Sequence, residues 1–279
     1  MKTVELASGI HSSALGFGCA PILGSVDRSV AVRAINVAID CGINHFDLAR
    51  SYGYGEAEGF IGKVIKGRRQ QFIIASKFGI QANWKAKLFR PIKPIVRAVR
   101  DNIFKRYYSE NSLSLNISHS IADRFHDRVP LSGVMMRASL ERTLSALKSE
   151  YLDYFFIHEP PGVLVHLDDL MTVADKLKSE GKIRAWGLAY NRSNESIHRL
   201  YLTQFDLLQF NISPGVLDYS IVVDERGNKP NILFSPLKGG GLMKPADKLK
   251  TLSEDFSKSV ILCSMFNEKH IKENSLLFD

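Results

Sequence analysis

Four polar residues of types that can move a proton follow apolar runs in this sequence. Tyr52 comes five positions after Asp47, Lys77 lies in the run FIIASKFG, and His158 ends the run YFFIH. A free tyrosine has a pKa of about 10, too high for an efficient acid at neutral pH, so an adjacent cation such as Lys77 is needed to stabilise its phenolate. Asp47 would keep that lysine charged and aimed, and His158 would hydrogen-bond the substrate oxygen. The four residues predict a site that gives a proton to a carbonyl oxygen.

Each of these residues also has a structural explanation when it is taken singly. They are a helix-capping aspartate, a half-buried tyrosine, a surface lysine and a satisfied core histidine. Their placement at the carboxyl ends of successive expected strands favours the joint interpretation, because barrel enzymes keep their chemistry at that face.

The elements that must position these residues form a repeating pattern of apolar runs and segments with helical period, which is typical of a parallel sheet built from βα units. We expect an α/β fold, an eight-stranded (β/α)8 TIM barrel. Its strands are expected at 14–20, 45–49, 72–78, 152–158, 184–190, 206–212, 232–237 and 260–265. Residues 3–13 should form a hairpin at the barrel bottom, and 243–258 should hold only a stunted helix between the last two strands.

Length and composition agree with one large core. The chain has 279 residues and is 45% hydrophobic, close to the roughly 250 residues of a typical barrel. A single domain over 1–279 is therefore expected. No apolar leader opens the chain and no apolar run reaches about 18 residues, which predicts a soluble, cytoplasmic protein. Three widely spaced cysteines without a CxxC pair predict reduced thiols, with neither a disulfide framework nor a metal site.

A long insertion after the third expected strand, residues 80–131, breaks the repeat. Its span 81–131 holds ten Lys/Arg and four Asp/Glu, a net +6 of the chain's +8. Apolar residues at three- and four-residue spacing predict a basic amphipathic helix, interrupted at its start by Pro91 and Pro94. The insertion should lie on the catalytic face as a lid, as a structural cover, or as a membrane or protein docking surface through 85–107. Nucleic acid is not expected, since no binding motif accompanies the charge.

The sequence resembles the aldo-keto reductase family. FDLARSYGYGE fits the family word FDxAxxYGxxE, and the likeness continues through GFGCA, ASKFG, FIHEP, QFN, FSPL and NEKHIKEN. The resemblance implies a (β/α)8 barrel and a nicotinamide dinucleotide, usually NADPH, bound without a Rossmann fingerprint. It also implies that Asp47, Tyr52, Lys77 and His158 form the catalytic tetrad.

The resemblance further implies contacts for the cofactor. Gln209 would bond the nicotinamide carboxamide and Phe234 would stack on its ring. Ser235, Leu237 and Gly239 would meet the pyrophosphate, although the glycine run 239–241 is equally read as a flexible loop. The other contacts implied by position are Gly18, Cys19, Ala20, Asn191, Ser264, Phe266, Asn267, Lys269, His270 and Asn274.

Two departures from the family pattern shape the expected ligands. The strand-five word GLAYN places Ala189 and Tyr190 where Ser and Asn are usual, which is similar to the aldose and sugar dehydrogenase branch and favours a sugar-like substrate. Only Lys269 and His270 are candidates to hold a 2′-phosphate, so NADPH is expected and NADH stays open.

The expected activity is an NAD(P)H-dependent interconversion of a carbonyl and an alcohol, on a small-molecule carbonyl or sugar-like substrate. An anionic or carrier-linked substrate is one form of this expectation, because of the basic insertion. Two alternatives stay open at this stage. They are a nicotinamide-sensing docking barrel and a redox-neutral lyase or epimerase that retains its cofactor.

Overall fold

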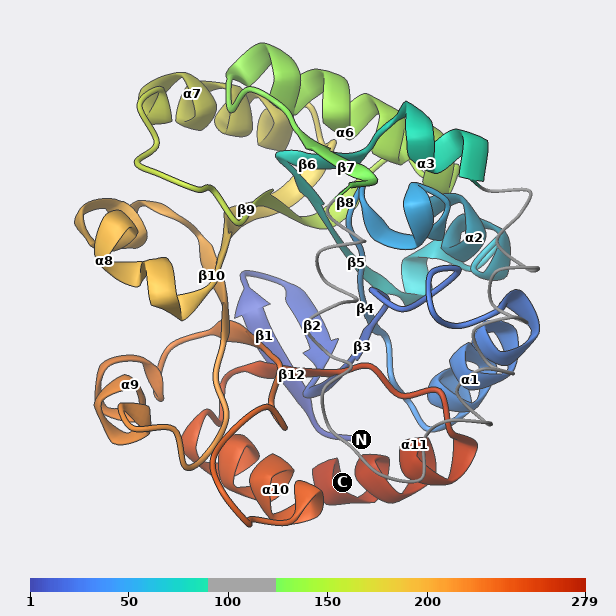
Figure 1. Cartoon of the computed structure of the whole chain (residues 1–279), viewed down its shortest axis with the longest axis vertical. Coiled ribbons are helices and arrows are strands. Elements are labelled where there is room, and N and C mark those ends of the chain that lie inside the picture. The colour runs from blue at the N-terminus through green and yellow to red at the C-terminus, as the bar shows by residue number, and fades with distance from the viewer. Residues whose placement is uncertain (90–123) are drawn as a thin grey trace.

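The centre of the structure, a computed structural model that describes residues 1–89 and 124–279, is a closed barrel of eight parallel strands in the order β10-β11-β12-β3-β4-β5-β8-β9. The expected (β/α)8 barrel is confirmed (Figure 1). The strand bounds are β3 Leu15–Gly18, β4 His45–Asp47, β5 Ile73–Phe78, β8 Leu152–His158, β9 Ile183–Tyr190, β10 Leu207–Asn211, β11 Asn231–Phe234 and β12 Val260–Cys263.

The strands read as near-continuous apolar runs because helices cover the outside of the barrel and side chains fill its inside. All six residues of β5 and all seven of β8 are buried. Parallel pairing places Asp47 opposite Ala75, Lys77 opposite Phe156, and His158 opposite Ala189. This register brings the polar ends of β4, β5 and β8 to one face of the barrel.

One or more helices follow each barrel strand and surround the barrel (Figure 1). The main ones are α1 Arg28–Asp40, α2 Ala57–Val64, α6 Gly133–Leu147, α7 Leu167–Ser179, α8 Glu195–His198, α9 Tyr219–Arg226, α10 Pro245–Asp255 and α11 Glu268–Ser275. The prediction of a stunted helix before the last strand is wrong, since α10 has 11 residues. Pro245 fits the first turn, where no backbone donor is needed, and Leu249 and Leu252 bury the inner face.

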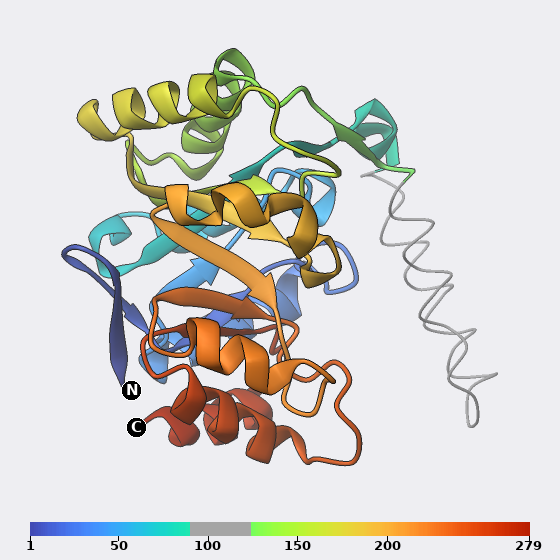
Figure 2. The ribbon, with the colours of Figure 1, turned by 90° about the vertical axis from the view of Figure 1, so that its left-hand side faces the viewer.

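The expected hairpin is present as β1 Thr3–Ala7 and β2 Ile10–Ser13, which pair antiparallel. Figure 2 shows it at the end of the barrel opposite to the β6–β7 ribbon. Ser12 Oγ lies 3.2 Å from Nδ1 of His45 and 3.5 Å from the hydroxyl of Tyr154. These contacts fix the hairpin against the amino ends of β4 and β8.

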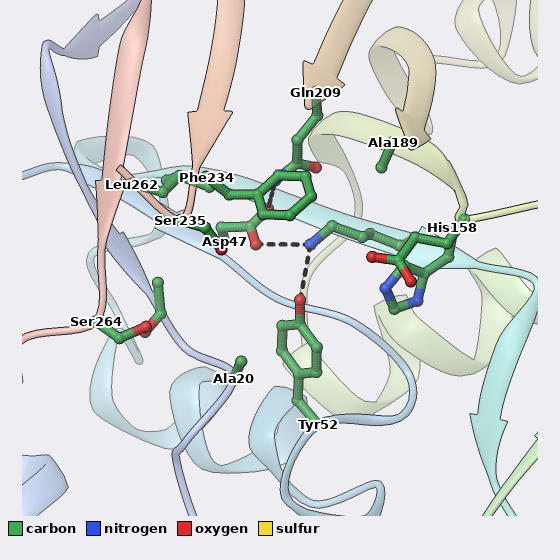
Figure 3. A pocket seen from close by; sticks show the side chains of 13 residues that line it. Ala20, Asp47, Tyr52, His158, Ala189, Gln209, Phe234, Ser235, Leu262 and Ser264 are labelled. Atoms are coloured by element: carbon green, nitrogen blue, oxygen red, sulfur yellow. Dashed lines mark hydrogen bonds and ion pairs between the residues drawn. The ribbon is translucent and has the colours of Figure 1, made fainter. Parts of the chain in front are cut away.

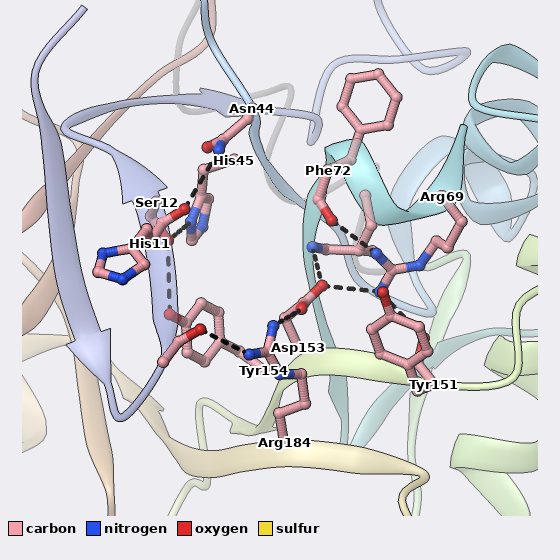
Figure 4. A network of polar contacts seen from close by, with 12 residues as sticks. His11, Ser12, Asn44, His45, Arg69, Phe72, Tyr151, Asp153, Tyr154 and Arg184 are labelled. Carbon is pink, nitrogen blue, oxygen red and sulfur yellow. Dashed lines mark hydrogen bonds and ion pairs between the residues drawn. The ribbon is translucent and has the colours of Figure 1, made fainter.

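A buried carboxylate, Asp153, organises the same end of the barrel (Figure 4). It accepts hydrogen bonds from Arg69 Nη2 at 2.8 Å, Arg184 Nη1 at 2.9 Å and the backbone N–H of Ile74 at 2.9 Å. Arg184 also donates to the carbonyl of Gly9 in the hairpin turn at 2.8 Å. Buried carboxylates need such partners, and here the partners join three strands to the hairpin.

The insertion after β5 begins and ends in a two-stranded antiparallel ribbon, β6 Ile80–Ala82 with β7 His126–Arg128, and α3 Trp84–Phe89 follows β6. The ribbon lies at the carboxyl ends of the barrel strands (Figure 2). Nε2 of His126 lies 3.2 Å from the carbonyl oxygen of Ser51, and Phe125 packs edge-on against Tyr54. Most of the predicted amphipathic helix and docking surface, 85–107, lies outside the described residues.

The cysteines Cys19, Cys41 and Cys263 are free, as the sequence predicts. Within 1–89 and 124–279, no helix has the length and apolar character needed to cross a membrane.

Candidate active site

Three side chains of the predicted tetrad form a chain of short contacts at the carboxyl face of the barrel (Figure 3). Lys77 Nζ donates to Asp47 Oδ2 at 2.6 Å and to the carbonyl oxygen of Leu48 at 2.8 Å. The same Nζ lies 3.3 Å from the Tyr52 hydroxyl. The His158 ring stands edge-on to the Tyr52 ring, with centroids 6.1 Å apart. The structure therefore brings all four predicted residues together.

The turn after β4 carries Tyr52 and depends on glycine. Tyr52 opens the 3₁₀ turn η1, Tyr52–Tyr54, in which Gly53 has φ +61°. A Cβ at Gly53 would lie 2.6 Å from the carbonyl oxygen of Ile22, so a larger residue would clash as well as being strained. Gly53 thus lets the turn approach the β3–α1 loop and direct the phenol toward Lys77.

A second buried carboxylate, Glu58 of α2, holds the surrounding elements in place. It accepts hydrogen bonds from Ser76 of β5 at 2.7 Å and Thr143 of α6 at 2.9 Å, and it pairs with Arg50. Ser76 directly precedes Lys77, and Arg50 lies two residues before Tyr52. The network therefore fixes the two segments that carry the lysine and the tyrosine.

Burial and charge act in opposite directions on Tyr52. The charge of Lys77 and its hydrogen bond lower the pKa of Tyr52, the direction that the sequence predicts. Burial outweighs this effect, and the net pKa of Tyr52 is raised to about 12. Burial lowers the pKa of Lys77, but Asp47 and Tyr52 more than compensate and the net pKa is raised. Lys77 is thus a cation and Tyr52 a neutral phenol at pH 7.

His158 is neutral in this environment. Burial lowers its pKa well below the ordinary value, and the charges of Lys77, Arg128 and His126 add to the effect. Its ring therefore carries one N–H, which can serve as a hydrogen-bond donor. Together with the neutral phenol of Tyr52, it supplies two donors at the same place.

A cavity of about 160 Å³ contains this cluster. Ten predicted site residues line it, namely Gly18, Ala20, Asp47, Tyr52, Lys77, His158, Gln209, Phe234, Ser235 and Ser264. Gln209 Nε2 donates to Asp47 Oδ1 at 3.0 Å, while its buried Oε1 has no partner among the described residues. An orphaned buried acceptor points to a ligand that donates a hydrogen bond there, as the carboxamide of a nicotinamide does.

A neighbouring cavity of about 500 Å³ extends the first along β11 and β12. The predicted cofactor residues in its wall are Ser235, Leu237, Ser264, Phe266, His270 and Asn274. Two of them, Ser235 and Ser264, line both cavities, so the two spaces adjoin and suit an extended dinucleotide. The described residues therefore fit the expected cofactor.

Five predicted cofactor residues lie outside the walls of these two cavities. Cys19 is fully buried and points its thiol at the carbonyl of Phe17, and Gly239 uses its carbonyl to accept from Lys248. Asn267 caps α11, and Lys269 is exposed, with its Nζ 3.7 Å from Glu273. Asn191 lines a third cavity of about 280 Å³, which shares Ser235 with the first two, and its side-chain oxygen accepts a hydrogen bond from the backbone N–H of Ser193.

The sequence interpretation missed two residues of the cavity that contains Tyr52 and Lys77, namely Glu159 and Leu262. Glu159 directly follows His158 at a strand end, and that position is the signal that could have identified it. Ala189, predicted as a departure from the family pattern, also lines the cavity.

A family comparison agrees with this geometry. The model of the Aldo/keto reductase family matches residues 14–275. The chain belongs to this family.

Individual relatives share less than a third of their aligned residues with this chain. The chain is 29% identical over 200 residues to the aldo-keto reductase YhdN of Bacillus subtilis, covering 69% of this chain and 46% of the relative. It is 26% identical over 238 residues to the NADH-specific methylglyoxal reductase of Escherichia coli, covering 83% and 64%. It is 22% identical over 209 residues to the D-threo-aldose 1-dehydrogenase of a Pseudomonas species, covering 72% and 57%. The matched stretch thus spans about half to two thirds of these relatives.

Solved structures share the fold of this aldo-keto reductase family member. The holo form of an aldo-keto reductase from Bacillus halodurans superposes with a TM-score of 0.67 at 21% identity, covering 99% of this chain and 90% of that one. An aldo-keto reductase from Klebsiella pneumoniae in complex with NADPH gives a TM-score of 0.63 at 18% identity, covering 100% and 89%.

Proposed function

We propose that this aldo-keto reductase family member is an NAD(P)H-dependent oxidoreductase that interconverts an aldehyde or ketone and an alcohol. One observation carries the proposal. The Tyr52 hydroxyl lies 3.3 Å from Lys77 Nζ, which lies 2.6 Å from Asp47, inside a cavity that His158 also lines. The proposed unit is one barrel domain over 1–279, with the insertion 80–131 on the catalytic face.

In the proposed reaction, Tyr52 gives its proton to the carbonyl oxygen during reduction. Tyr52 is a neutral phenol at neutral pH and so holds a proton to give, and the charge of Lys77 lowers its pKa against the effect of burial. Lys77 stabilises the phenolate that remains, and Asp47 keeps Lys77 in position. The neutral His158 ring donates a hydrogen bond to the same oxygen and fixes the direction of the carbonyl.

When bound, the nicotinamide supplies the hydride for the carbonyl carbon. We propose that Gln209 accepts from its carboxamide, since Gln209 Oε1 is otherwise unpaired among the described residues. Phe234, in the same cavity wall, would stack on the ring. His270 and Asn274 line the far cavity and would meet the adenosine end, whereas Lys269 is exposed beside Glu273.

NADPH is the proposed cofactor, and NADH remains an alternative. The Klebsiella pneumoniae structure contains NADPH, whereas the Escherichia coli relative is NADH-specific. His270 supplies a single hydrogen-bonding ring at the far cavity, which favours a 2′-phosphate only modestly. Titrating the protein fluorescence with each cofactor decides between them, and a tighter NADH constant would replace NADPH in the proposal.

The proposed substrate is a small carbonyl compound, with a sugar-like aldehyde as one form. The methylglyoxal reductase and the aldose dehydrogenase among the relatives act on compounds of this size. An anionic or carrier-linked substrate, attracted by the basic insertion, is a separate proposal that predicts a rate falling as salt screens the charge. A cytoplasmic location is proposed with the activity, because the three cysteines are free thiols.

The test is a turnover assay of the purified protein with NADPH and a panel of small aldehydes, followed at 340 nm. Loss of absorbance that disappears in Tyr52→Phe supports the proposal. Tight NADPH binding without turnover of any aldehyde would indicate a sensor or docking barrel. Product formation without a change at 340 nm would indicate a redox-neutral lyase or epimerase.

A further inference from the structure

Glu159 adopts a backbone conformation that is unfavourable for a glutamate. It follows His158 at the end of β8 and has φ +44°, in the left-handed region that favours glycine. Its N–H donates to the carbonyl of Ala189 at 2.7 Å, and its carbonyl accepts from Arg128 Nη1 at 2.6 Å. Both backbone groups are therefore held, and the conformation is imposed by β9 on one side and β7 on the other. Strain that neighbours maintain in this way is typical of functional positions.

The conformation places Glu159 in the wall of the catalytic cavity with Tyr52, Lys77 and His158. The charge of Glu159 contributes to raising the pKa of Tyr52, which agrees with this proximity. Asp47 is the other carboxylate among the described lining residues, and it is paired with Lys77 and Gln209. The carboxylate of Glu159 has no hydrogen bond or ion pair among residues 1–89 and 124–279, since Arg128 bonds only its backbone oxygen.

The carboxylate of Glu159 therefore lines the cavity without a direct hydrogen-bond or ion-pair partner among the described residues. Lys77 is already paired with Asp47, His158 is neutral, and the guanidinium of Arg128 bonds the backbone oxygen of Glu159 and not its carboxylate. An unpaired carboxylate beside a substrate accepts hydrogen bonds from hydroxyl or ammonium groups and repels anions.

We infer that Glu159 is a specificity-determining residue, which selects carbonyl substrates with a hydroxyl next to the reacting carbon and rejects 2-oxo acids. The inference rests on the proposed reductase function and names its substrate class. Arg128 is the positioning residue for this carboxylate, because it holds the backbone that directs it. The inference concerns only the groups next to the reacting carbon, so a substrate that carries a charge farther along its chain is compatible with it.

The test compares wild type with Glu159→Gln, which removes the charge and keeps the shape. Two substrate pairs isolate the effect. Glyceraldehyde and propanal are both three-carbon aldehydes, but only glyceraldehyde carries hydroxyl groups. Glyoxylate has a carboxylate next to its aldehyde carbon, where methylglyoxal has an acetyl group. In Glu159→Gln, kcat/KM for glyoxylate relative to methylglyoxal should rise about tenfold, a change of about 1.4 kcal/mol in transition-state stabilisation. The ratio of glyceraldehyde to propanal should fall several-fold.

Glu150→Gln is the matched control, since Glu150 is exposed just before the amino end of β8 and should leave both ratios unchanged. NADPH dissociation constants and thermal unfolding midpoints establish that each variant is folded. Equal changes for all four substrates, or no change in either ratio, would overturn the inference while leaving the reductase function intact. Failure of the wild type to reduce any of the four would instead count against the proposed function.

Discussion

Gln209 joins the proposed nicotinamide contact directly to Asp47, because its Nε2 donates to Asp47 Oδ1 at 3.0 Å. Its other amide atom, Oε1, is buried and unpaired among the described residues. One side chain thus faces two tasks, holding Asp47 and accepting a hydrogen bond from a ligand.

Gln209→Leu should weaken NADPH binding about fivefold, since one hydrogen bond is typically worth about 1 kcal/mol and Leu keeps most of the volume. Fluorescence titration gives the dissociation constant. Gln204→Leu, at an exposed position before β10, is the control and should bind NADPH normally. An unchanged constant in Gln209→Leu would remove Gln209 from the cofactor site.

Tyr52→Phe should lower single-turnover hydride transfer by about 10²- to 10⁴-fold, the usual contribution of a general acid. NADPH binding should not change, because the ring remains. Tyr54→Phe is a control from the same turn, since Tyr54 packs on Phe125 and is not among the lining residues of the catalytic cavity. Near-equal transfer rates in wild type and Tyr52→Phe would exclude Tyr52 as the acid.

Lys77→Met should abolish most activity and also destabilise the fold by about 3 kcal/mol, because it leaves the buried Asp47 carboxylate without its cation. The double variant Asp47→Asn with Lys77→Met removes both charges and should recover most of the stability, but none of the activity. Urea unfolding and turnover assays separate the two effects. Recovery of activity in the double variant would contradict a role for the Lys77 charge.

Stability should fall as the pH drops below about 6.5. Burial lowers the pKa of His45 to about 3, and burial also lowers the pKa of His158 well below its ordinary value. The unfolded chain therefore binds protons at these two residues in a pH range where the folded chain does not, so acid favours unfolding. The two residues together can contribute a slope of up to about 2.7 kcal/mol per pH unit. His45→Gln should reduce the slope between pH 6 and 5 by half of that amount, and identical slopes would refute the assignment.

Replacing residues 90–123 with a short Gly/Ser linker should leave a folded protein that binds NADPH and reduces glyceraldehyde. The replacement keeps the β6–β7 ribbon and the bond from Arg128 to Glu159. Replacing all of 80–131 removes that bond and should shift the glyoxylate preference in the same direction as Glu159→Gln. Thermal unfolding, NADPH titration and kcat/KM provide the measurements, and loss of folding in the shorter replacement would make the segment a structural part of the barrel.

The sequence predicts the barrel and the gathering of Asp47, Tyr52, Lys77 and His158 at one face, because both depend on the order and period of the strands. A polar residue at the end of a buried parallel run must reach the carboxyl face, whatever the details of packing, and this holds for Asp47 and His158. Side-chain direction is harder to predict. Cys19 and Lys269 occupy expected positions along the chain, but one points into the core and the other pairs with Glu273.

Effects that depend on burial or on distant contacts could not be predicted. The raised pKa of Tyr52 results from the exclusion of water by several elements, which no local motif records. The strained backbone of Glu159 depends on Arg128, which is 31 residues away in sequence.

The register of Ile80 with Arg128 has a consequence for how this chain can change. Strands β6 and β7 already hold the two ends of the insertion side by side. The entropic cost of closing a loop between them grows only with the logarithm of the loop's length. A change in the length of the segment between the two strands should therefore cost the fold little free energy. The ribbon is therefore a natural junction at which a different segment could be grafted onto this face of the barrel without a change in strand register.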